Sequence, residues 1–365
     1  MSMHHDTRRS TYSVKVACAV LLAAAFLAGL TACSRNSSPK SNGEALYLYN
    51  WTYYTPDSIL LAFTEETGIQ VIVDNFSSNE EMFAKLRAGG GRVGYDIVFP
   101  SADYTSIMIK LDMLEKLDHE KLPNVKHATK LVHEKATYDP DFLYSVPYFM
   151  GAAGVAVNTT LVPSGYERNW DIFADKRFAR RMTMLDDMRE VMGDALIHLG
   201  YSNNTTDLLQ LAEAQSYIIE NWKPNLVKFD AESFGKSFGS GEFWAVHSYP
   251  ENVYEEFPES RWHEIDFFLP PEGGSMYIDN MVILKDAPHK DAAHAFIDFI
   301  YRPEIYAQFL DEFHLPPTVH SSAVEYMETT PLYSADDLAN YSIIEDLGES
   351  LDLYNDLWHD IRYMD

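Results

Sequence analysis

The sequence predicts an α/β fold made of two lobes, and three observations support this prediction. Strand-like apolar runs alternate with helical patterns along the chain, which is typical of α/β sheets. Hydrophobic residues make up 46% of the chain and aromatic residues 13%, as in a well-packed globular protein. About 320 residues follow a signal-like N-terminal segment, which is too many for one core of ordinary size and favours two domains.

The first strand–helix–strand unit follows that segment directly. Ala45–Tyr49 is an apolar and aromatic run that predicts a buried strand. Thr55 and Pro56 are the residue types that favour an N-cap and a first helical position, so we expect a helix to begin there. Gly68 ends this helix, and Ile69–Val73 is the second predicted strand.

The same alternation continues toward the C-terminus. We expect further helices over Glu80–Arg87, Tyr104–Leu111, Asp291–Tyr301 and Leu351–Tyr363. We expect further strands over Tyr95–Phe99, Val155–Val157, Met182–Leu185, Ala245–His247 and Met281–Leu284. Pro303 is expected to stop the helix before it. Because ligand sites in open α/β sheets lie at the carboxyl ends of strands, Trp51, Ser101 and Tyr249 occupy candidate positions.

The N-terminus has the features of a secretory signal. Basic residues precede an apolar run over residues 16–30, which is short for a membrane span and suits a signal peptide. Leu30-Thr31-Ala32-Cys33 resembles the bacterial lipoprotein box, which predicts removal of residues 1–32 and lipidation of Cys33, for example with palmitate. Residues 33–43 are rich in Ser, Asn, Pro and Gly and predict a flexible tether. The alternative is an uncleaved anchor helix.

Charge and cysteine content narrow the class of protein. The chain has 28 Lys and Arg against 55 Asp and Glu, a net charge of −27, which argues against nucleic acid as a partner. A negative surface favours a cationic ligand, although solubility alone also explains it. Cys18 and Cys33 are the only cysteines, so we expect no disulfide in the mature fold. No segment after the signal has 18 uncharged apolar residues, so no transmembrane helix is expected there.

Motifs of catalysis are missing from the sequence. The His-Glu pairs lack the second His of a zinc-protease helix, the Gly-rich segment at 89–91 lacks the residues of a phosphate loop, and no Gly-x-Ser-x-Gly elbow occurs. We therefore expect no catalytic residue, no cofactor and no metal. Asp186, Asp187 and Glu190 are paired carboxylates that a glycosidase could use, although such pairs arise by chance in so acidic a chain.

Three segments carry side chains that suit a cation. Trp51 and Tyr54 follow a strand, and aromatic faces attract ammonium groups, although they could equally form a half-buried rim. Asp187 and Glu190 share one face at the start of a helix, where carboxylates are also expected as caps. Tyr277-Ile278-Asp279 places an aromatic and an acid on one side of an extended segment, or lies in an ordinary loop.

Taken in order, the segments resemble those of the spermidine/putrescine-binding proteins of bacterial ABC importers, which have the type II periplasmic binding-protein fold with a hinge of crossing strands. The resemblance spans the chain from residue 45. It is carried by Leu46–Thr52, Glu65–Ile69, Ser78–Glu80, Ala84–Leu86, Tyr95–Val98, Pro100–Ser101, Tyr144–Tyr148, Asp186–Val191, Leu199–Ser202, Asn204–Asp207, Pro271–Gly274 and Asp279.

The resemblance implies a set of ligand contacts. Trp51 and Tyr54 would clamp the methylenes and ammonium groups, and Ser101 would add a polar contact. Asp187 and Glu190 would hold one terminal amine, and Asp279 would hold another nitrogen.

The chain also departs from the family pattern. Asp103 stands where a tyrosine is usual, and Tyr249 and Tyr277 stand where tryptophans are usual. Leu315 occupies a usual tyrosine position, and a C-terminal glutamine position falls at Ile344 or Glu345. Asp103 is expected to supply a charge partner that is lost elsewhere.

The resemblance implies a lipid-anchored polyamine receptor in the periplasm or cell envelope, and not an enzyme. Its lobes would hold residues 44–151 with 279–323 and residues 152–278 with 324–365. Its partners would be a polyamine, an ABC permease with a separate ATPase subunit, and the membrane through the lipid only. The alternatives are a receptor of the same fold for another solute, an extracytoplasmic hydrolase that uses Asp187 and Glu190, and a surface adhesin.

Overall fold

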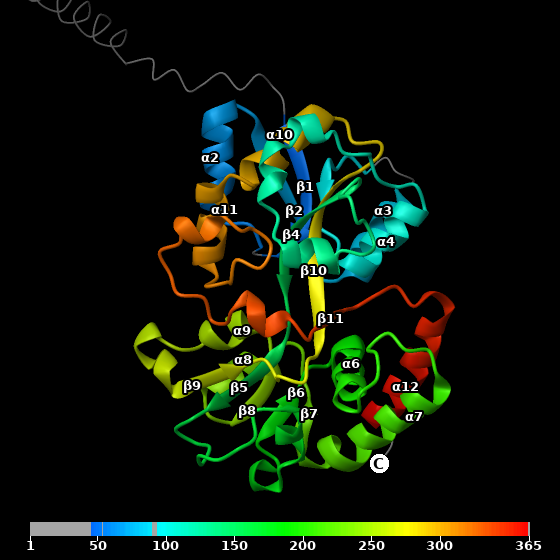
Figure 1. Cartoon of the computed structure of the whole chain (residues 1–365), viewed down its shortest axis with the longest axis vertical. Coiled ribbons are helices and arrows are strands. Elements are labelled where there is room, and N and C mark those ends of the chain that lie inside the picture. The colour runs from blue at the N-terminus through cyan, green and yellow to red at the C-terminus, as the bar shows by residue number, and fades with distance from the viewer. Residues whose placement is uncertain (1–44, 53, 90–92, 364–365) are drawn as a thin grey trace, which may run out of the picture. The chain divides into compact units, whose positions relative to one another are not determined.

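The computed structural model describes residues 45–52, 54–89 and 93–363, which form two β-sheets flanked by helices (Figure 1). The predicted signal segment, the lipidation site at Cys33 and the tether lie outside the described residues. The predicted α/β architecture is confirmed. Among the helices that the structure describes, none has the length and apolar content needed to span a bilayer.

The first sheet has the strand order β11-β10-β3-β1-β2, with β4 paired to β10. Its strands are β1 (Ala45–Trp51), β2 (Gln70–Phe76), β3 (Ile97–Val98), β4 (Ser145–Gly151), β10 (Ser275–Ile283) and β11 (Ser342–Ile343). Strands β1, β2 and β3 run parallel, whereas β10 is antiparallel to β3 and β4. The helices around this sheet are α2 (Asp57–Thr67), α3 (Asn79–Ala88), α4 (Ala102–Lys110), α5 (Lys130–Lys135), α10 (Lys290–Ile300) and α11 (Pro303–Glu312).

The second sheet has the strand order β7-β6-β8-β5-β9. Its strands are β5 (Gly154–Asn158), β6 (Met182–Met184), β7 (Leu226–Phe229), β8 (Ala245–Ser248) and β9 (Ile265–Phe268). Strand β6 is parallel to β7 and β8, and β5 is antiparallel to β8 and β9. The helices around it are α6 (Met188–His198), α7 (Leu208–Tyr217), α8 (Phe234–Gly239), α9 (Pro250–Tyr254) and α12 (Leu351–Tyr363).

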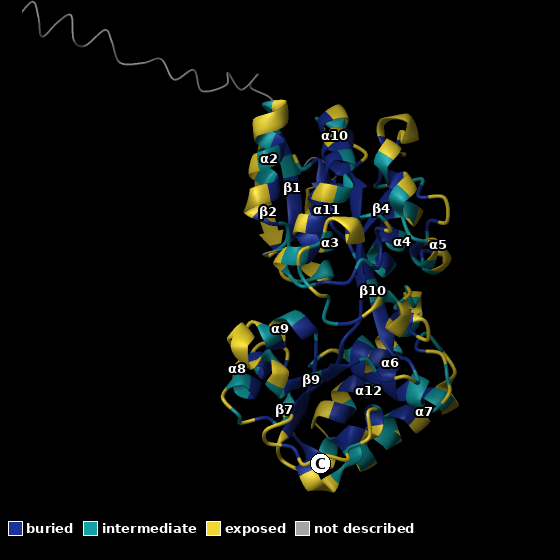
Figure 2. Cartoon of the chain, turned by 60° about the vertical axis from the view of Figure 1, so that its left-hand side comes forward, coloured by how far each residue is buried: buried dark blue, intermediate teal, exposed yellow. Residues whose placement is uncertain are grey.

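Both sheets are covered by amphipathic helices. The strands are mostly buried, and the helices bury one face and expose the other (Figure 2). In α12 the spacing of Tyr354, Trp358 and Ile361 places all three in the core of the second sheet, so this C-terminal helix stabilises the second sheet.

Strands β4 and β10 connect the two sheets. Strand β4 ends at Gly151 and β5 begins at Gly154, so the buried residues Ala152 and Ala153 carry the chain from one sheet to the other. Strand β10 returns beside β4 in an antiparallel pair whose register shifts between Asp279 and Asn280 (Figure 1). These are the crossing strands that the resemblance implied.

A tight turn precedes β10. Gly273 has a φ of +103°, and a Cβ atom there would lie 2.3 Å from the backbone oxygen of Asn340. Only glycine adopts this conformation and this close approach without strain.

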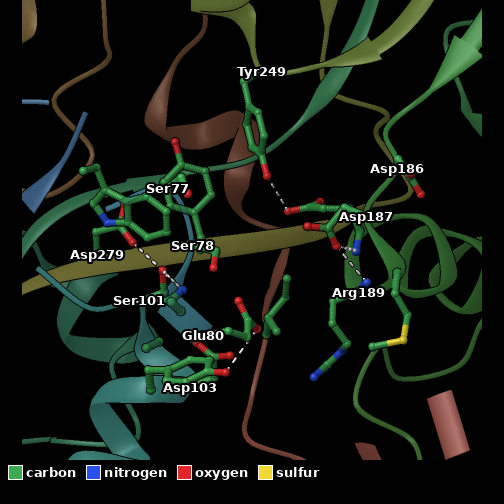
Figure 3. A pocket seen from close by; sticks show the side chains of 18 of the residues that line it. Ser77, Ser78, Glu80, Ser101, Asp103, Asp186, Asp187, Arg189, Tyr249 and Asp279 are labelled. Carbon is green, nitrogen blue, oxygen red and sulfur yellow. Dashed lines mark hydrogen bonds between the residues drawn. The ribbon is translucent and has the colours of Figure 1, made fainter. Parts of the chain in front are cut away.

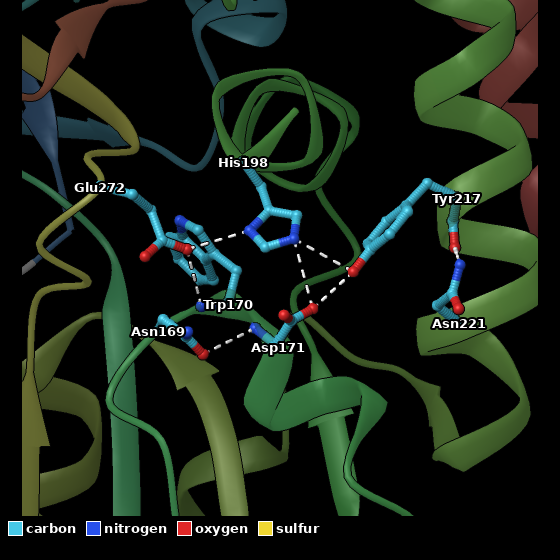
Figure 4. Close-up of polar contacts among 7 residues, drawn as sticks. All are labelled: Asn169, Trp170, Asp171, His198, Tyr217, Asn221 and Glu272. Carbon is cyan, nitrogen blue, oxygen red and sulfur yellow. Dashed lines mark hydrogen bonds and ion pairs between the residues drawn. The ribbon is translucent and has the colours of Figure 1, made fainter. Parts of the chain in front are cut away.

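A polar network ties α6 to the segment before β10 (Figure 4). His198 Nδ1 lies 3.1 Å from Glu272 Oε1, and Nε2 lies 3.1 Å from Tyr217 Oη and 3.3 Å from Asp171 Oδ1. The Trp170 N–H donates to the same Glu272 oxygen at 3.0 Å. The hydrogen bond with Glu272, together with the charge of Asp171, raises the pKa of His198, although partial burial opposes this.

The predicted start of the first helix is wrong. Helix α2 begins at Asp57 and not at Pro56, and Thr55 is not its cap. The Thr55 hydroxyl instead accepts a hydrogen bond from Asn50 Nδ2 at 2.9 Å and lies 3.0 Å from Tyr148 Oη. The helix before Pro303 ends at Ile300, as expected, and Pro303 is the first residue of the next helix, α11, where its missing N–H leaves no hydrogen bond unmade.

Several strand boundaries also differ from the prediction. Strand β10 begins at Ser275 and not at Met281, because pairing with β4 extends a segment whose glycines and polar residues look like a loop. The strand predicted over Tyr95–Phe99 shortens to Ile97–Val98, and Ile69 lies outside β2.

Candidate functional site

A cavity of about 620 Å³ lies where the carboxyl ends of strands from both sheets meet. All of the side chains predicted to contact a ligand line it, from Trp51 at the end of β1 to Asp279 in β10. Figure 3 views this cavity, with Ser101 and Asp279 on one side and Asp187 and Arg189 on the other. Its lining residues are Trp51, Tyr54, Ser77, Ser78, Asn79, Glu80, Ser101, Ala102, Asp103, Tyr104, Asp186, Asp187, Met188, Arg189, Glu190, Tyr249, Glu251, Tyr277, Asp279, Ile344 and Trp358.

Asp279 is the acceptor at the centre of the first side. Tyr54 Oη donates to Asp279 Oδ2 at 2.7 Å, and Ser101 Oγ donates to Oδ1 at 2.6 Å. Asn79 Nδ2 donates to the same Ser101 hydroxyl at 3.0 Å, which holds it in place. Burial raises the pKa of Asp279 to about 6, although the two hydroxyl donors partly offset the rise.

Trp51 supplies an aromatic wall beside Asp279. Its Nε1 donates to the Phe99 carbonyl at 2.8 Å, and its ring packs on Phe76 with centroids 4.5 Å apart. These contacts fix the indole while leaving it half-buried at the cavity. A fixed aromatic face costs little ordering entropy when a cation binds against it.

Asp187 and Glu190 form the second side. Asp187 is the N-cap of α6, and its Oδ1 accepts the N–H groups of Arg189 at 2.8 Å and of Glu190 at 3.1 Å. Asp187 therefore caps the helix, as one interpretation of the sequence predicted, and it also lines the cavity, where its contact with a ligand stays a prediction. Glu190 is 2% exposed, and its Oε1 accepts a hydrogen bond from Tyr249 Oη at 3.2 Å.

Tyrosines join the two sides. The rings of Tyr249 and Tyr277 meet edge to face with centroids 5.7 Å apart. Tyr277 and Asp279 are two residues apart in β10 and both line the cavity, as the extended segment predicted. Methylene groups of a ligand could pack against these rings.

Asp103 and the other departures from the family pattern fall in different places. Asp103 is the second residue of α4, lines the cavity, and has a pKa raised to about 6 by burial. Ile344 lines the cavity, whereas the Glu345 carbonyl accepts a hydrogen bond from Arg189 Nη1 at 3.0 Å. Leu315 lies in the core.

Sequence reasoning missed several lining residues, and Arg189 and Glu251 matter most. Two contacts fix the Arg189 side chain. Its Nη2 donates to Asn204 Oδ1 at 2.6 Å, and its guanidinium carbon lies 5.2 Å from the centroid of the Tyr354 ring. Glu251 follows Tyr249 at the start of α9, and burial raises its pKa to about 7. Arg189 belongs to the Asp186–Val191 segment that resembles the family, and Glu251 lies two residues after the predicted contact Tyr249. This closeness in sequence is the signal that could have identified both residues.

The charge of the cavity is one-sided. Seven carboxyl groups and one guanidinium belong to the lining residues that the structure describes. The carboxyl groups are those of Glu80, Asp103, Asp186, Asp187, Glu190, Glu251 and Asp279. Buried carboxylates without partners are costly, so this arrangement favours a ligand that brings positive charge.

Comparison with known proteins gives a consistent result. The family described as bacterial extracellular solute-binding protein matches residues 59–339. A spermidine/putrescine-binding periplasmic protein of Haemophilus influenzae is 32% identical over 94% of this chain and 98% of its own length, and one of Escherichia coli is 30% identical over 92% and 96%. The structure of the TpPotD lipoprotein of Treponema pallidum is similar, with 47% identity, a TM-score of 0.85, and coverage of 88% of this chain and all of that one.

These relatives bear on two expectations. The expected resemblance to polyamine-binding proteins and the two-lobed fold are confirmed. The family and these relatives are solute-binding proteins and not enzymes, which argues against the hydrolase alternative for Asp187 and Glu190.

Proposed function

We propose that this chain, which belongs to the family of bacterial extracellular solute-binding proteins, captures a polyamine such as putrescine or spermidine in its cavity. The observation that carries the proposal is the arrangement of carboxyl groups on two sides of one aromatic-walled cavity. Asp279 lies on one side, and Asp187 and Glu190 lie on the other. A chain with an ammonium group at each end and methylenes between would match this pattern.

The roles of the lining residues follow from their chemistry. Trp51 and Tyr54 would clamp the methylenes and one ammonium, and Tyr249 and Tyr277 would form the opposite wall. Ser101 would orient Asp279, and Asp103 would add a further charge partner. A buried ammonium needs a carboxylate or an aromatic face, because leaving it unpaired costs several kcal/mol.

Capture would involve closure of two lobes. The proposed lobes hold residues 44–151 with 279–323 and residues 152–278 with 324–365, and β4 and β10 would be the hinge between them. A ligand that binds the closed state more tightly shifts the population toward it, so X-ray scattering should record compaction on addition of polyamine. Unchanged dimensions at saturating ligand would contradict closure.

Delivery would require a membrane partner. We propose that a lipid on Cys33 holds the protein in the cell envelope, where an ABC permease with a separate ATPase subunit receives the ligand. The lipoprotein named for Treponema pallidum supports an anchor of this kind. Mass spectrometry of the membrane-extracted protein tests it, because acyl mass should be found on Cys33 and be lost in Cys33→Ala.

Calorimetry with a panel of solutes tests the ligand class. Putrescine, cadaverine, spermidine, γ-aminobutyrate and glutamate would be titrated into wild type and into Trp51→Ala, Trp51→Phe and Asp187→Asn. We expect tight binding of the diamines or spermidine, with Trp51→Ala and Asp187→Asn each weaker by roughly 1–3 kcal/mol and Trp51→Phe less affected. Affinity within twofold of wild type for both weakened variants would exclude the site, and preference for an amino acid would favour a same-fold receptor for another solute.

A further inference from the structure

We propose that Glu190, Asp194 and His247 form a binding site for a divalent transition metal of the zinc type, directly behind the cavity. Helix α6 places Glu190 and Asp194 one turn apart on the same face, and β8 supplies His247. One ligand atom from each residue lies within 4.8 Å of the other two. The three residues are only 2%, 1% and 0% exposed, so the cluster is walled off from the surface.

All three side chains have buried polar atoms without a hydrogen-bond partner. Glu190 Oε1 is engaged by Tyr249 and Asp194 Oδ1 accepts the Ser275 N–H at 2.9 Å, but Glu190 Oε2 and Asp194 Oδ2 have no hydrogen-bond partner. Both ring nitrogens of His247 are also without one. Each buried polar atom left in this state costs about 1–3 kcal/mol, which is unusual for three neighbouring side chains.

The spacing suits metal coordination better than an ion pair. His247 Nε2 and Asp194 Oδ2 are 3.4 Å apart, which is too long for a good charged hydrogen bond. Two ligands of a tetrahedral zinc ion, each about 2.0–2.2 Å from the metal, lie about 3.3–3.6 Å from one another. Both ring nitrogens of His247 lack a hydrogen-bond partner, so a nitrogen lone pair is available for coordination.

The ligand set and its surroundings indicate which metal would bind. One imidazole nitrogen and two carboxylate oxygens are ligands that zinc accepts, and a dication would balance two buried carboxylates. The edge-to-face ring of Trp170, 5.2 Å from the imidazole, limits access of water. Three protein ligands would leave one coordination position open.

The site shares Glu190 with the proposed polyamine contact, so metal and polyamine should oppose one another. A metal on Glu190 would remove the negative charge that holds the ligand's ammonium. This antagonism rests on the proposed function, whereas metal binding itself does not. Asp194 and His247 do not belong to the residues that line the cavity, so they separate the two activities.

The test uses chelator-treated protein with Zn²⁺ as titrant in calorimetry and Co²⁺ as an optical probe. We expect one strong Zn²⁺ site per chain and visible Co²⁺ absorption of the tetrahedral type. Asp194→Asn and His247→Gln should each weaken Zn²⁺ at least tenfold and remove the Co²⁺ spectrum, while both still bind putrescine. Asp279→Asn, which changes the cavity but not the cluster, is the matched control and should keep the Zn²⁺ site.

The outcomes distinguish this inference from the proposed function. Equal Zn²⁺ uptake by wild type, Asp194→Asn and His247→Gln would mean surface binding only and would overturn the metal site, even if putrescine binds normally. A lost Zn²⁺ site in these variants without putrescine binding by wild type would support the metal site and overturn the proposed function. If both bind, saturating Zn²⁺ should weaken putrescine at least fivefold in wild type and not in Asp194→Asn, and an unchanged affinity would overturn the antagonism.

Discussion

Replacing Asp279 by asparagine should stabilise the ligand-free protein while impairing its proposed activity. Asp279 is 6% exposed, and the ionisable groups that face it are the phenols of Tyr54, Tyr138, Tyr148 and Tyr277. It makes no ion pair with any residue that the structure describes. Above pH 7 the protein therefore holds a buried carboxylate whose negative charge is stabilised only by hydrogen bonds from hydroxyl groups.

The free energy follows from the pKa of this group. The pKa rises from 3.8 to about 6, which corresponds to about 3 kcal/mol of unfavourable ionisation. Because the pKa is raised on folding, the penalty is absent below pH 4 and complete only above pH 6. An asparagine keeps the volume, and the hydroxyls of Tyr54 and Ser101 can reorient toward it at a cost of about 1 kcal/mol. We therefore expect Asp279→Asn to be about 1–2 kcal/mol more stable than wild type at pH 8.

The affinity for putrescine should change in the opposite direction. The ammonium groups of a diamine stay charged from pH 5 to 8, so only the ionised fraction of Asp279 pairs with the ligand. With a pKa of about 6, this fraction falls about tenfold between pH 7.5 and pH 5, and wild-type affinity should fall by the same factor. Asp279→Asn should bind weakly at pH 7.5 and lose this part of the pH dependence.

Urea denaturation at pH 5 and pH 8, with calorimetric titration at the same pH values, would measure both effects. Asp103→Asn is the matched control, because burial raises the pKa of Asp103 to about 6 as well, but Asp103 lies in α4 and not in β10. It should retain the pH dependence that comes from Asp279. The reasoning would be refuted if the difference in stability between Asp279→Asn and wild type were the same at pH 5 and pH 8, or if the variant kept the wild-type slope of affinity against pH.

Three further changes test other parts of the structure. Asp187→Ala should lower the free energy of unfolding by about 1 kcal/mol through loss of the α6 cap, whereas Asp187→Asn keeps the cap and should lose polyamine affinity alone; equal stability of the two variants in urea would contradict the capping role. The raised pKa of His198 adds stability below about pH 6.5 that is lost as the pH rises through the folded value, so His198→Gln should lower the melting temperature more at pH 5.5 than at pH 8, and an equal loss at both would show that its charge contributes nothing (Figure 4). Gly273→Ala should destabilise by at least about 2 kcal/mol because of its positive φ and the contact with the Asn340 oxygen, and a near-wild-type urea midpoint would rule out that strain.

The sequence predicted those parts of the site that depend on local patterns. Trp51, Ser101 and Tyr249 were predicted because each lies at or just after the end of a strand, where ligand sites of α/β sheets lie. Tyr277 and Asp279 were found because alternate residues of an extended segment share a side. These local rules needed no knowledge of how distant segments pack.

The parts that were missed depend on pairing between distant segments. Pairing with β4 is what extends β10 back to Ser275, and no local pattern in the Gly-rich segment indicates it. Asp194 looks like an ordinary helical residue, and His247 an ordinary strand residue, until β8 and α6 pack together. The expectation of no metal rests on motif spacing and stays a prediction, which Zn²⁺ binding to the proposed cluster would contradict.

The position of the pocket residues has a consequence for how this protein could change over evolution. Trp51 is the last residue of β1, and Ser101, Asp187 and Tyr249 stand shortly after strands have ended, so the loops that follow can vary without altering hydrogen bonding within either sheet. Asp279 differs, because it lies inside a paired strand, and a one-residue insertion before it would turn it away from the cavity. New solute preferences should therefore arise by substitution at the strand ends, while the length of β10 stays invariant.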